Sequence, residues 1–171
     1  MSRRMDYVIG LDKPVADLYQ SFTSREYWED LIAEHQQHTD SEMTHFHSGS
    51  GGTDIVFTHT VSRRDMPSMI AAVVPLRLTI TREQHFAPFD PPATNSADGH
   101  YRALVPAAPM NFDGTYVLQR TATGSELRLS SLCKVNVPLV GGKIEKWVLD
   151  GLRGLFDNER DFTRDWIASH Y

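Results

Sequence analysis

The chain contains a single cysteine, Cys133, which excludes a disulfide bond within the chain. Such sparse cysteine is typical of proteins from a reducing compartment, so we expect a cytoplasmic protein. Cys133 lies in an alternating apolar run, where it shares one face with Leu127, Leu129 and Val135. No general base adjoins it in the sequence, so we interpret it as a core residue rather than a nucleophile.

Basic clusters and long apolar runs are also scarce. The net charge is -5, and only Arg3-Arg4 and Arg63-Arg64 form basic pairs. Binding to a phosphate backbone depends on clustered lysine and arginine, so we expect no nucleic-acid partner. No stretch approaches the roughly 20 apolar residues of a bilayer-spanning helix. The segment 5–10 is too short and polar for a signal peptide, so no stable membrane insertion is expected either.

A long amphipathic segment without proline runs from Lys143 to about Ala168. Its apolar residues recur at steps of three and four, and charged residues fill the other side, which predicts one long helix. At a rise of about 1.5 Å per residue, this helix would be roughly 40 Å long. A helix of that length needs a broad apolar partner, and the strand-rich middle of the chain is the candidate.

Two short helices are predicted before the strands. Pro14 suits the first turn of a helix over residues 15–22. The spacing of Thr23 and Glu26 matches a capping box, which predicts that a second helix starts there. This second helix would turn Tyr27 and Trp28 toward the core.

Apolar alternation predicts the strands, and glycine and proline mark the segments between them. The proline-bracketed segment 66–75 is predicted as a loop or a turn of helix, and a proline-rich loop is expected from Pro88 to about Asp98-Gly99. Strands are expected over residues 3–11, 43–47, 54–61, 76–86, 100–105, 111–120 and 126–137.

The predicted fold class is therefore α+β. A curved antiparallel sheet of about six or seven strands, two short N-terminal helices and a long C-terminal helix would enclose a cavity. Length and composition favour one domain over residues 1–171.

Both this order of elements and several motifs resemble the START-like, or SRPBCC, superfamily, whose fold is called helix-grip. Within it, the chain is most similar to a bacterial family of unknown function. The motifs are Met5-Asp6-Tyr7, Pro14-Val15, Tyr27-Trp28, Leu78-Thr79-Ile80-Thr81-Arg82, the segment 137–145 with sequence VPLVGGKIE, and Phe162-Thr163. The resemblance implies a hydrophobic cavity between helix and sheet. Members of the superfamily use this cavity for lipid transfer, for quinone or hormone binding, or for cyclising polyketide-like chains.

Candidate ligand-binding residues follow from the predicted inner faces of the strands and the long helix. The alternative is that these side chains pack solidly and leave no space. The candidates are Ile55, Phe57, Leu78, Ile80, Arg82, Tyr101, Ala103, Tyr116, Leu118, Leu129, Cys133, Trp147, Gly151, Leu152 and Leu155.

Arg82 is the most informative polar candidate. It follows Leu78 and Ile80 on one strand face, and a buried arginine needs a carboxylate or a ligand as its partner. Glu83 and His85 are expected on the outer face, whereas the hydroxyls of Tyr101 and Tyr116 could reach the cavity. Spacing alone identifies no catalytic residue.

Gly151 and Gly154 each cost the long helix roughly 1 kcal/mol relative to alanine. We expect that close packing against another element offsets this cost. Space left for a ligand and a simple kink are the alternatives.

Neither a metal nor a cofactor is expected. His45, His47 and His59 could converge only in a favourable register, and His35 and His38 show no ligand spacing, so we interpret all five as surface or rim histidines. The segment Gly141-Gly142-Lys143 lacks the remaining residues of a phosphate-binding loop.

These patterns favour a protein that binds a hydrophobic or amphipathic small molecule, such as a lipid, quinone or polyketide-like compound, as a carrier or sensor. One alternative is an enzyme of the cyclase or dehydratase type that uses the polar cavity residues. Another is a protein-interaction module without a ligand. The sequence does not determine the oligomeric state.

Overall fold

The computed structural model describes residues 2–90, 96–106 and 108–171. In this part of the chain, seven strands form one antiparallel sheet in the order β1-β7-β6-β5-β4-β3-β2. The strands are β1 (Arg3–Leu11), β2 (Asp40–Gly49), β3 (Gly52–Ser62), β4 (Arg77–Phe86), β5 (Ser96–Leu104), β6 (Met110–Arg120) and β7 (Ser125–Val135). The helices are α1 (Val15–Phe22), α2 (Arg25–His35), the 3-10 turn η1 (Arg63–Asp65), α3 (Ser68–Ala71) and α4 (Gly141–His170).

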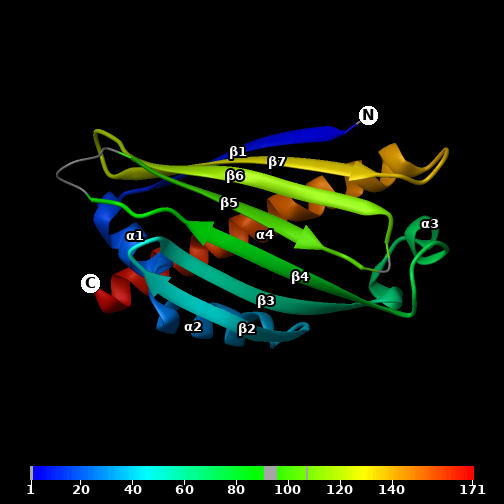
Figure 1. Ribbon diagram of the computed structural model, residues 1–171, viewed down its shortest axis with the longest axis horizontal. Coiled ribbons are helices and arrows are strands. Elements are labelled where there is room, and N and C mark those ends of the chain that lie inside the picture. Colours follow the sequence, from blue (N-terminus) through cyan, green and yellow to red (C-terminus); the bar gives the residue numbers. More distant parts are fainter. Residues whose placement is uncertain (1, 91–95, 107) are drawn as a thin grey trace.

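Helix α4 runs along one face of the curved sheet, from the end that carries α3 to the end that carries α1 and α2 (Figure 1). With 30 residues it is about 45 Å long. The predicted combination of curved antiparallel sheet, two short N-terminal helices and long C-terminal helix is confirmed. In the described part of the chain, no helix is long and apolar enough to cross a membrane.

Two local predictions are wrong. Thr23 does not cap α2, because its hydroxyl donates to the carbonyl of Tyr19 and closes the end of α1; Ser24 takes the N-cap position without a side-chain bond. Strand β5 begins at Ser96, so the loop that was predicted to reach Asp98-Gly99 ends earlier than expected. Residues 91–95 of that predicted loop lie outside the described residues. The segment 66–75 was predicted as a loop or a turn of helix, and it contains the short helix α3.

Glycine in β5 and β6 makes room for two tyrosine rings. Gly99 pairs with Tyr116 and Gly114 pairs with Tyr101 across the two strands. A Cβ atom on either glycine would collide with the ring of its partner. The two rings therefore lie flat against the sheet, nearly parallel, with centroids 5.8 Å apart. This need for close approach explains why Gly99 lies within β5, where the sequence pattern predicted the end of a loop.

The end of the molecule formed by α1, α2 and the last turns of α4 is filled by aromatic side chains. The ring of Tyr27 lies 5.2 to 5.7 Å from those of Phe22, Trp28, Phe162 and Trp166, centroid to centroid. The Tyr27 hydroxyl forms a 2.8 Å hydrogen bond with Thr163 Oγ1, and the Trp28 indole donates to the Phe22 carbonyl. Predicted to turn inward, Tyr27 and Trp28 are 2% and 3% exposed.

Candidate functional site

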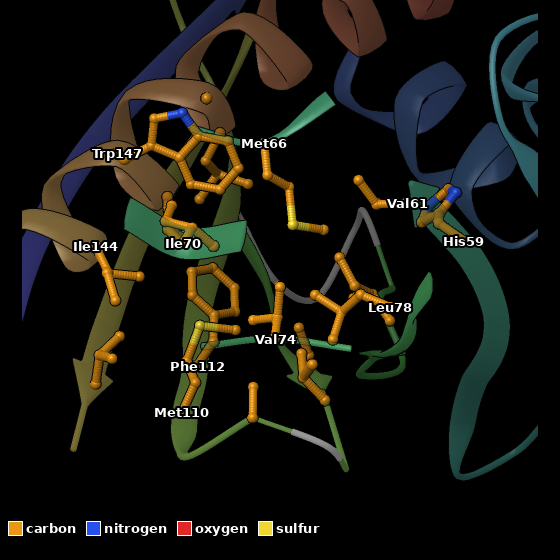
Figure 2. Close-up of a pocket in the computed structure, with 18 of the residues that line it drawn as sticks. His59, Val61, Met66, Ile70, Val74, Leu78, Met110, Phe112, Ile144 and Trp147 are labelled. Atoms are coloured by element: carbon orange, nitrogen blue, oxygen red, sulfur yellow. The ribbon is translucent and has the colours of Figure 1, made fainter. Parts of the chain in front are cut away.

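A cavity of about 370 Å³ lies at the other end of the molecule, between the sheet, α3 and the first half of α4. Figure 2 shows Ile70 and Val74, from α3 and the segment after it, facing the same space as Phe112 of β6 and Ile144 of α4. Most of its wall is aliphatic or aromatic. Val73 and Trp147 belong to this wall and are 42% and 40% exposed, so the cavity communicates with solvent beside them.

The structure brings most of the predicted site residues together around this space. Nine of them line the main cavity: Leu78, Ile80, Arg82, Tyr101, Ala103, Trp147, Gly151, Leu152 and Leu155. Tyr116 and Leu129 instead line a smaller cavity of about 60 Å³ toward the aromatic end, where Arg82, Tyr101 and Phe156 form part of both walls.

Four predicted site residues line neither cavity: Ile55, Phe57, Leu118 and Cys133. All four are at most 1% exposed and belong to the packed core. The Phe57 ring, for example, lies 5.9 Å from that of Trp28 on α2. Alternation placed these side chains on the inner face correctly, but other elements cover them. Burial also raises the pKa of the Cys133 thiol to about 11, which fits its predicted role as a core residue.

Gly151 and Gly154 are not closely packed, so that expectation is wrong. A Cβ atom at either position would meet nothing within 4 Å. Gly151 belongs to the cavity wall, whereas Gly154 does not. Gly151 therefore lies at the rim of the cavity, since it belongs to the wall and is exposed.

Arg82 faces inward as predicted and forms an ion pair with Glu159 of α4. Its Nη1 lies 2.7 Å from Glu159 Oε1 and its Nη2 lies 3.5 Å from Oε2, with both side chains only 15 to 17% exposed. Burial alone would raise the pKa of Glu159, but the charge of Arg82 and its hydrogen bond hold that pKa below its usual value. The guanidinium also lies 4.7 Å from the centroid of the Phe57 ring.

His59 and His35 correct the expectation that all five histidines lie at the surface or rim. The centroids of their rings are 5.0 Å apart, and His59 belongs to the cavity wall together with Arg82. His59 Nδ1 lies 2.8 Å from Ser41 Oγ, while His59 Nε2 and His35 Nδ1 are buried without a hydrogen-bond partner. Burial lowers the pKa of both, that of His59 to about 3. The alternation of β3 explains the outcome, since His59 continues the inner row of Ile55 and Phe57.

The tyrosine hydroxyls that could have served acid-base chemistry already have partners. Tyr101 forms a 2.7 Å hydrogen bond with Ser131 Oγ, and the Tyr116 hydroxyl donates to the backbone carbonyl of His85 at 2.5 Å. Burial raises the pKa of Tyr101 to about 12. His45 and His47 are exposed, and the described residues contain no group of side chains arranged to hold a metal ion.

Sequence reasoning missed Glu159, His35 and the inward position of His59. A signal for Glu159 was present, because it lies on the helical stripe formed by Leu152, Phe156 and Thr163, at steps of four, three and four. A carboxylate on an apolar stripe is the partner that an inward arginine requires. No comparable signal existed for His35, whose position depends on how α2 packs.

Comparison with known proteins gives a family of unknown function and a well-represented fold. Residues 6–167 match a family described as "Protein of unknown function (DUF2505)". Uncharacterised proteins of Mycobacterium tuberculosis and Mycobacterium bovis are each 27% identical over 177 aligned positions, which cover 99% of this chain and 99% of theirs.

Solved structures share the fold at low sequence identity. Norcoclaurine synthase from Thalictrum flavum, solved with dopamine and hydroxybenzaldehyde, is 11% identical with a TM-score of 0.58, covering 100% of this chain and 89% of its own. The di-domain ARO/CYC protein BexL is 14% identical with a TM-score of 0.61, covering 96% of this chain and 49% of its own. At such identities the likeness concerns the fold alone, and it confirms the predicted helix-grip fold.

Proposed function

The chain belongs to the DUF2505 family of proteins of unknown function, and we propose that it binds a hydrophobic or amphipathic small molecule in its main cavity, as a carrier or sensor. A lipid, a quinone or a polyketide-like compound would suit this cavity. The proposal includes membership of the START-like superfamily, one START-like domain over residues 1–171, and a cytoplasmic location. The nine predicted residues in the cavity wall would be the ligand contacts.

The observation that carries this proposal is the combination of size and apolar wall. Small-molecule sites measure about 300 to 1,000 Å³, and a cavity of about 370 Å³ lies in that range. If it stayed empty and dry, it would cost about 9 kcal/mol at about 24 cal/mol per Å³ of cavity. That cost is comparable with the whole stability of a domain, so the space is expected to be filled, either by water through its open side or by a molecule with apolar surface.

Burial of the ligand supplies the affinity in this account. Removing apolar surface from water contributes about 25 cal/mol per Å², and the aliphatic side chains of β4, α3 and α4 provide the matching wall. Entry would take place beside Val73 and Trp147, where the wall is exposed. Arg82, at the far end, would orient the molecule.

The enzyme alternative gains no support from the polar groups. The hydroxyls of Tyr101 and Tyr116 are engaged with Ser131 and the sheet backbone, and His59 has a pKa of about 3, too low for an effective general base near neutral pH. Binding without chemistry therefore remains the proposal.

Native mass spectrometry of freshly purified protein, followed by solvent extraction, tests the proposal. Gly151→Phe places a ring at the rim of the cavity, and Gly154→Phe is the matched control on the same helix outside the cavity wall. We expect a reproducible apolar adduct in the wild type and Gly154→Phe, and its loss in Gly151→Phe. Absence of any adduct, together with no change in melting temperature on adding apolar compounds, would contradict the proposed function.

A further inference from the structure

The polar side chains in the main cavity wall are few. In the described part of the wall, side-chain nitrogen or oxygen atoms occur only in His59, Arg82, Tyr101, Arg102 and Trp147. A ligand in this space must form its polar contacts with these groups or with free backbone atoms. The wall groups that have no other partner determine which polar groups a bound ligand can have.

Few side chains in the wall can accept a hydrogen bond. The Tyr101 hydroxyl already forms one hydrogen bond with Ser131 Oγ, in which either oxygen could be the donor, and it keeps the capacity for a second. His59 bonds to Ser41 through Nδ1, and its Nε2 is buried inside the wall. Figure 2 shows the His59 ring at the edge of the cavity view, with its nitrogen atoms on the side away from Val74 and Leu78.

Several loop carbonyls next to the cavity are used. Arg63 donates to the carbonyl oxygens of Ala71 and Val74, at 2.5 and 3.0 Å. The carbonyl of Val105 accepts from Ala108, and that of Val137 accepts from Gly141. In the sheet, β3 pairs with β4 from Arg77 to Phe86, whereas β5 pairs with β4 only from Thr81 to Phe86.

Donors remain. A guanidinium carries five N–H groups and no acceptor, and two of the Arg82 nitrogens point to Glu159. The Arg102 guanidinium is paired with Glu83, and the Trp147 indole at the mouth is a donor only. The charged and indole groups of this wall are therefore donors only.

Charge at the Arg82 end is balanced. Arg82 and Glu159 neutralise each other within a region where both are mostly buried. A carboxylate ligand on Arg82 would approach the Glu159 carboxylate and would meet like-charge repulsion in a weakly screened environment.

We propose that the ligand is an uncharged apolar molecule with a hydrogen-bond acceptor, such as a ketone, ester or quinone, whose carbonyl oxygen accepts from Arg82. This inference rests on the proposed function and narrows its ligand class. It excludes free fatty acids as the preferred occupants.

Four probes of one shape test the inference: ethylnaphthalene, acetylnaphthalene, naphthylethanol and naphthoate, all substituted at the same ring carbon. Their dissociation constants are measured by isothermal titration calorimetry at neutral pH. We expect acetylnaphthalene to bind about tenfold more tightly than ethylnaphthalene, because it gains a hydrogen bond to a charged donor. Naphthylethanol, whose hydroxyl oxygen can also accept from Arg82, should bind more tightly than ethylnaphthalene, and naphthoate should be the weakest of the four.

Glu159→Gln sharpens the test because it removes the balancing charge while keeping the shape of the side chain. We expect the affinity for naphthoate to rise at least tenfold in this variant, with that for acetylnaphthalene changed less than threefold. His45→Gln, at an exposed position of β2, is the control and should leave the ranking unchanged. The order of the four dissociation constants in the wild type tests the inference even if Glu159→Gln fails to fold.

Two kinds of failure remain distinguishable. If naphthoate binds most tightly to the wild type, or ethylnaphthalene binds as tightly as acetylnaphthalene, this inference is wrong and the proposed function stands. If none of the four probes binds, the proposed function fails and the inference fails with it.

Discussion

The two ends of this molecule share one sheet and one helix but have opposite interiors. Toward the C-terminus of α4, the aromatic side chains of α1 and α2 fill the space between helix and sheet. Toward its N-terminus, the short helix α3 stands in the corresponding place and a cavity of about 370 Å³ remains (Figure 1). The same pair of secondary-structure elements therefore supports a filled core and a hollow one.

What differs is the element that closes each end. Helices α1 and α2 bring Phe22, Tyr27 and Trp28 inward, whereas the four residues of α3 bury only Ile70. The ion pair of Arg82 with Glu159 lies at the boundary, since Arg82 belongs to the walls of both cavities. We infer that the aromatic end supplies stability and the hollow end supplies binding.

The largest expected effect is a difference in lost stability between a substitution at the aromatic end and one at the hollow end. Trp28→Ala should lower the free energy of unfolding by about 4 kcal/mol, because it leaves a cavity in a packed core and an unpaired Phe22 carbonyl. Leu155→Ala, in the half-buried wall of the hollow end, should cost about 1 kcal/mol because little packing is lost there. Urea unfolding followed by circular dichroism measures both. Equal losses would remove the distinction between the ends.

The boundary pair should give the next largest effect. Arg82→Met leaves the Glu159 carboxylate buried without its partner, and we expect a loss of about 3 kcal/mol. The double variant with Glu159→Leu should recover most of that loss, since the uncompensated charge is gone. Chemical denaturation of the three proteins measures this, and a double variant no more stable than Arg82→Met would contradict the account.

A pH dependence should follow from His59 and His35, whose pKa values are lowered in the folded protein. The unfolded chain binds protons near pH 6.5 but the folded chain does not, so stability is complete above that pH and is lost as pH falls toward about 3. We expect a loss of about 1 to 2 kcal/mol between pH 7.5 and pH 5.

Arg82 opposes the protonation of both rings and Glu159 favours it, while Glu34 favours and His38 opposes that of His35. The double variant His35→Phe with His59→Phe should flatten the urea midpoint plotted against pH, and His45→Gln should leave its slope as in the wild type. A slope that survives in the double variant would assign the dependence to other groups.

The smallest effect concerns the two helix glycines. Gly151→Ala and Gly154→Ala should each raise stability by about 0.5 to 1 kcal/mol, because alanine favours the helix and its Cβ atom meets nothing within 4 Å. Melting temperatures measure the gain. A loss at either position would show that the glycine is needed for close packing after all.

Much of the architecture was predictable because it depends on periodicity within single elements. The steps of three and four after Lys143 predicted α4, and alternation from Leu78 to Arg82 predicted that the arginine faces inward. Patterns of this kind are local, so they can be recognised without knowing which elements pack against each other.

The division between filled and hollow ends could not be predicted in this way. Ile55 and Leu78 both lie on inner strand faces, but Ile55 is packed in the core and Leu78 lines the cavity. Their difference depends on which helix covers each end of the sheet. The burial of His35 and His59 depends likewise on the docking of α2, and the capping-box prediction failed because Thr23 bonds backward into α1.

Methyl NMR on protein labelled at isoleucine and leucine tests the central claim most directly, with acetylnaphthalene as the added ligand. We predict shifts for the methyl groups of Leu78, Leu152 and Leu155, which line the cavity, and none for Ile32 and Ile167 in the aromatic end. Shifts centred on Ile32 and Ile167, or none anywhere at saturating ligand, would contradict a hollow end built for binding.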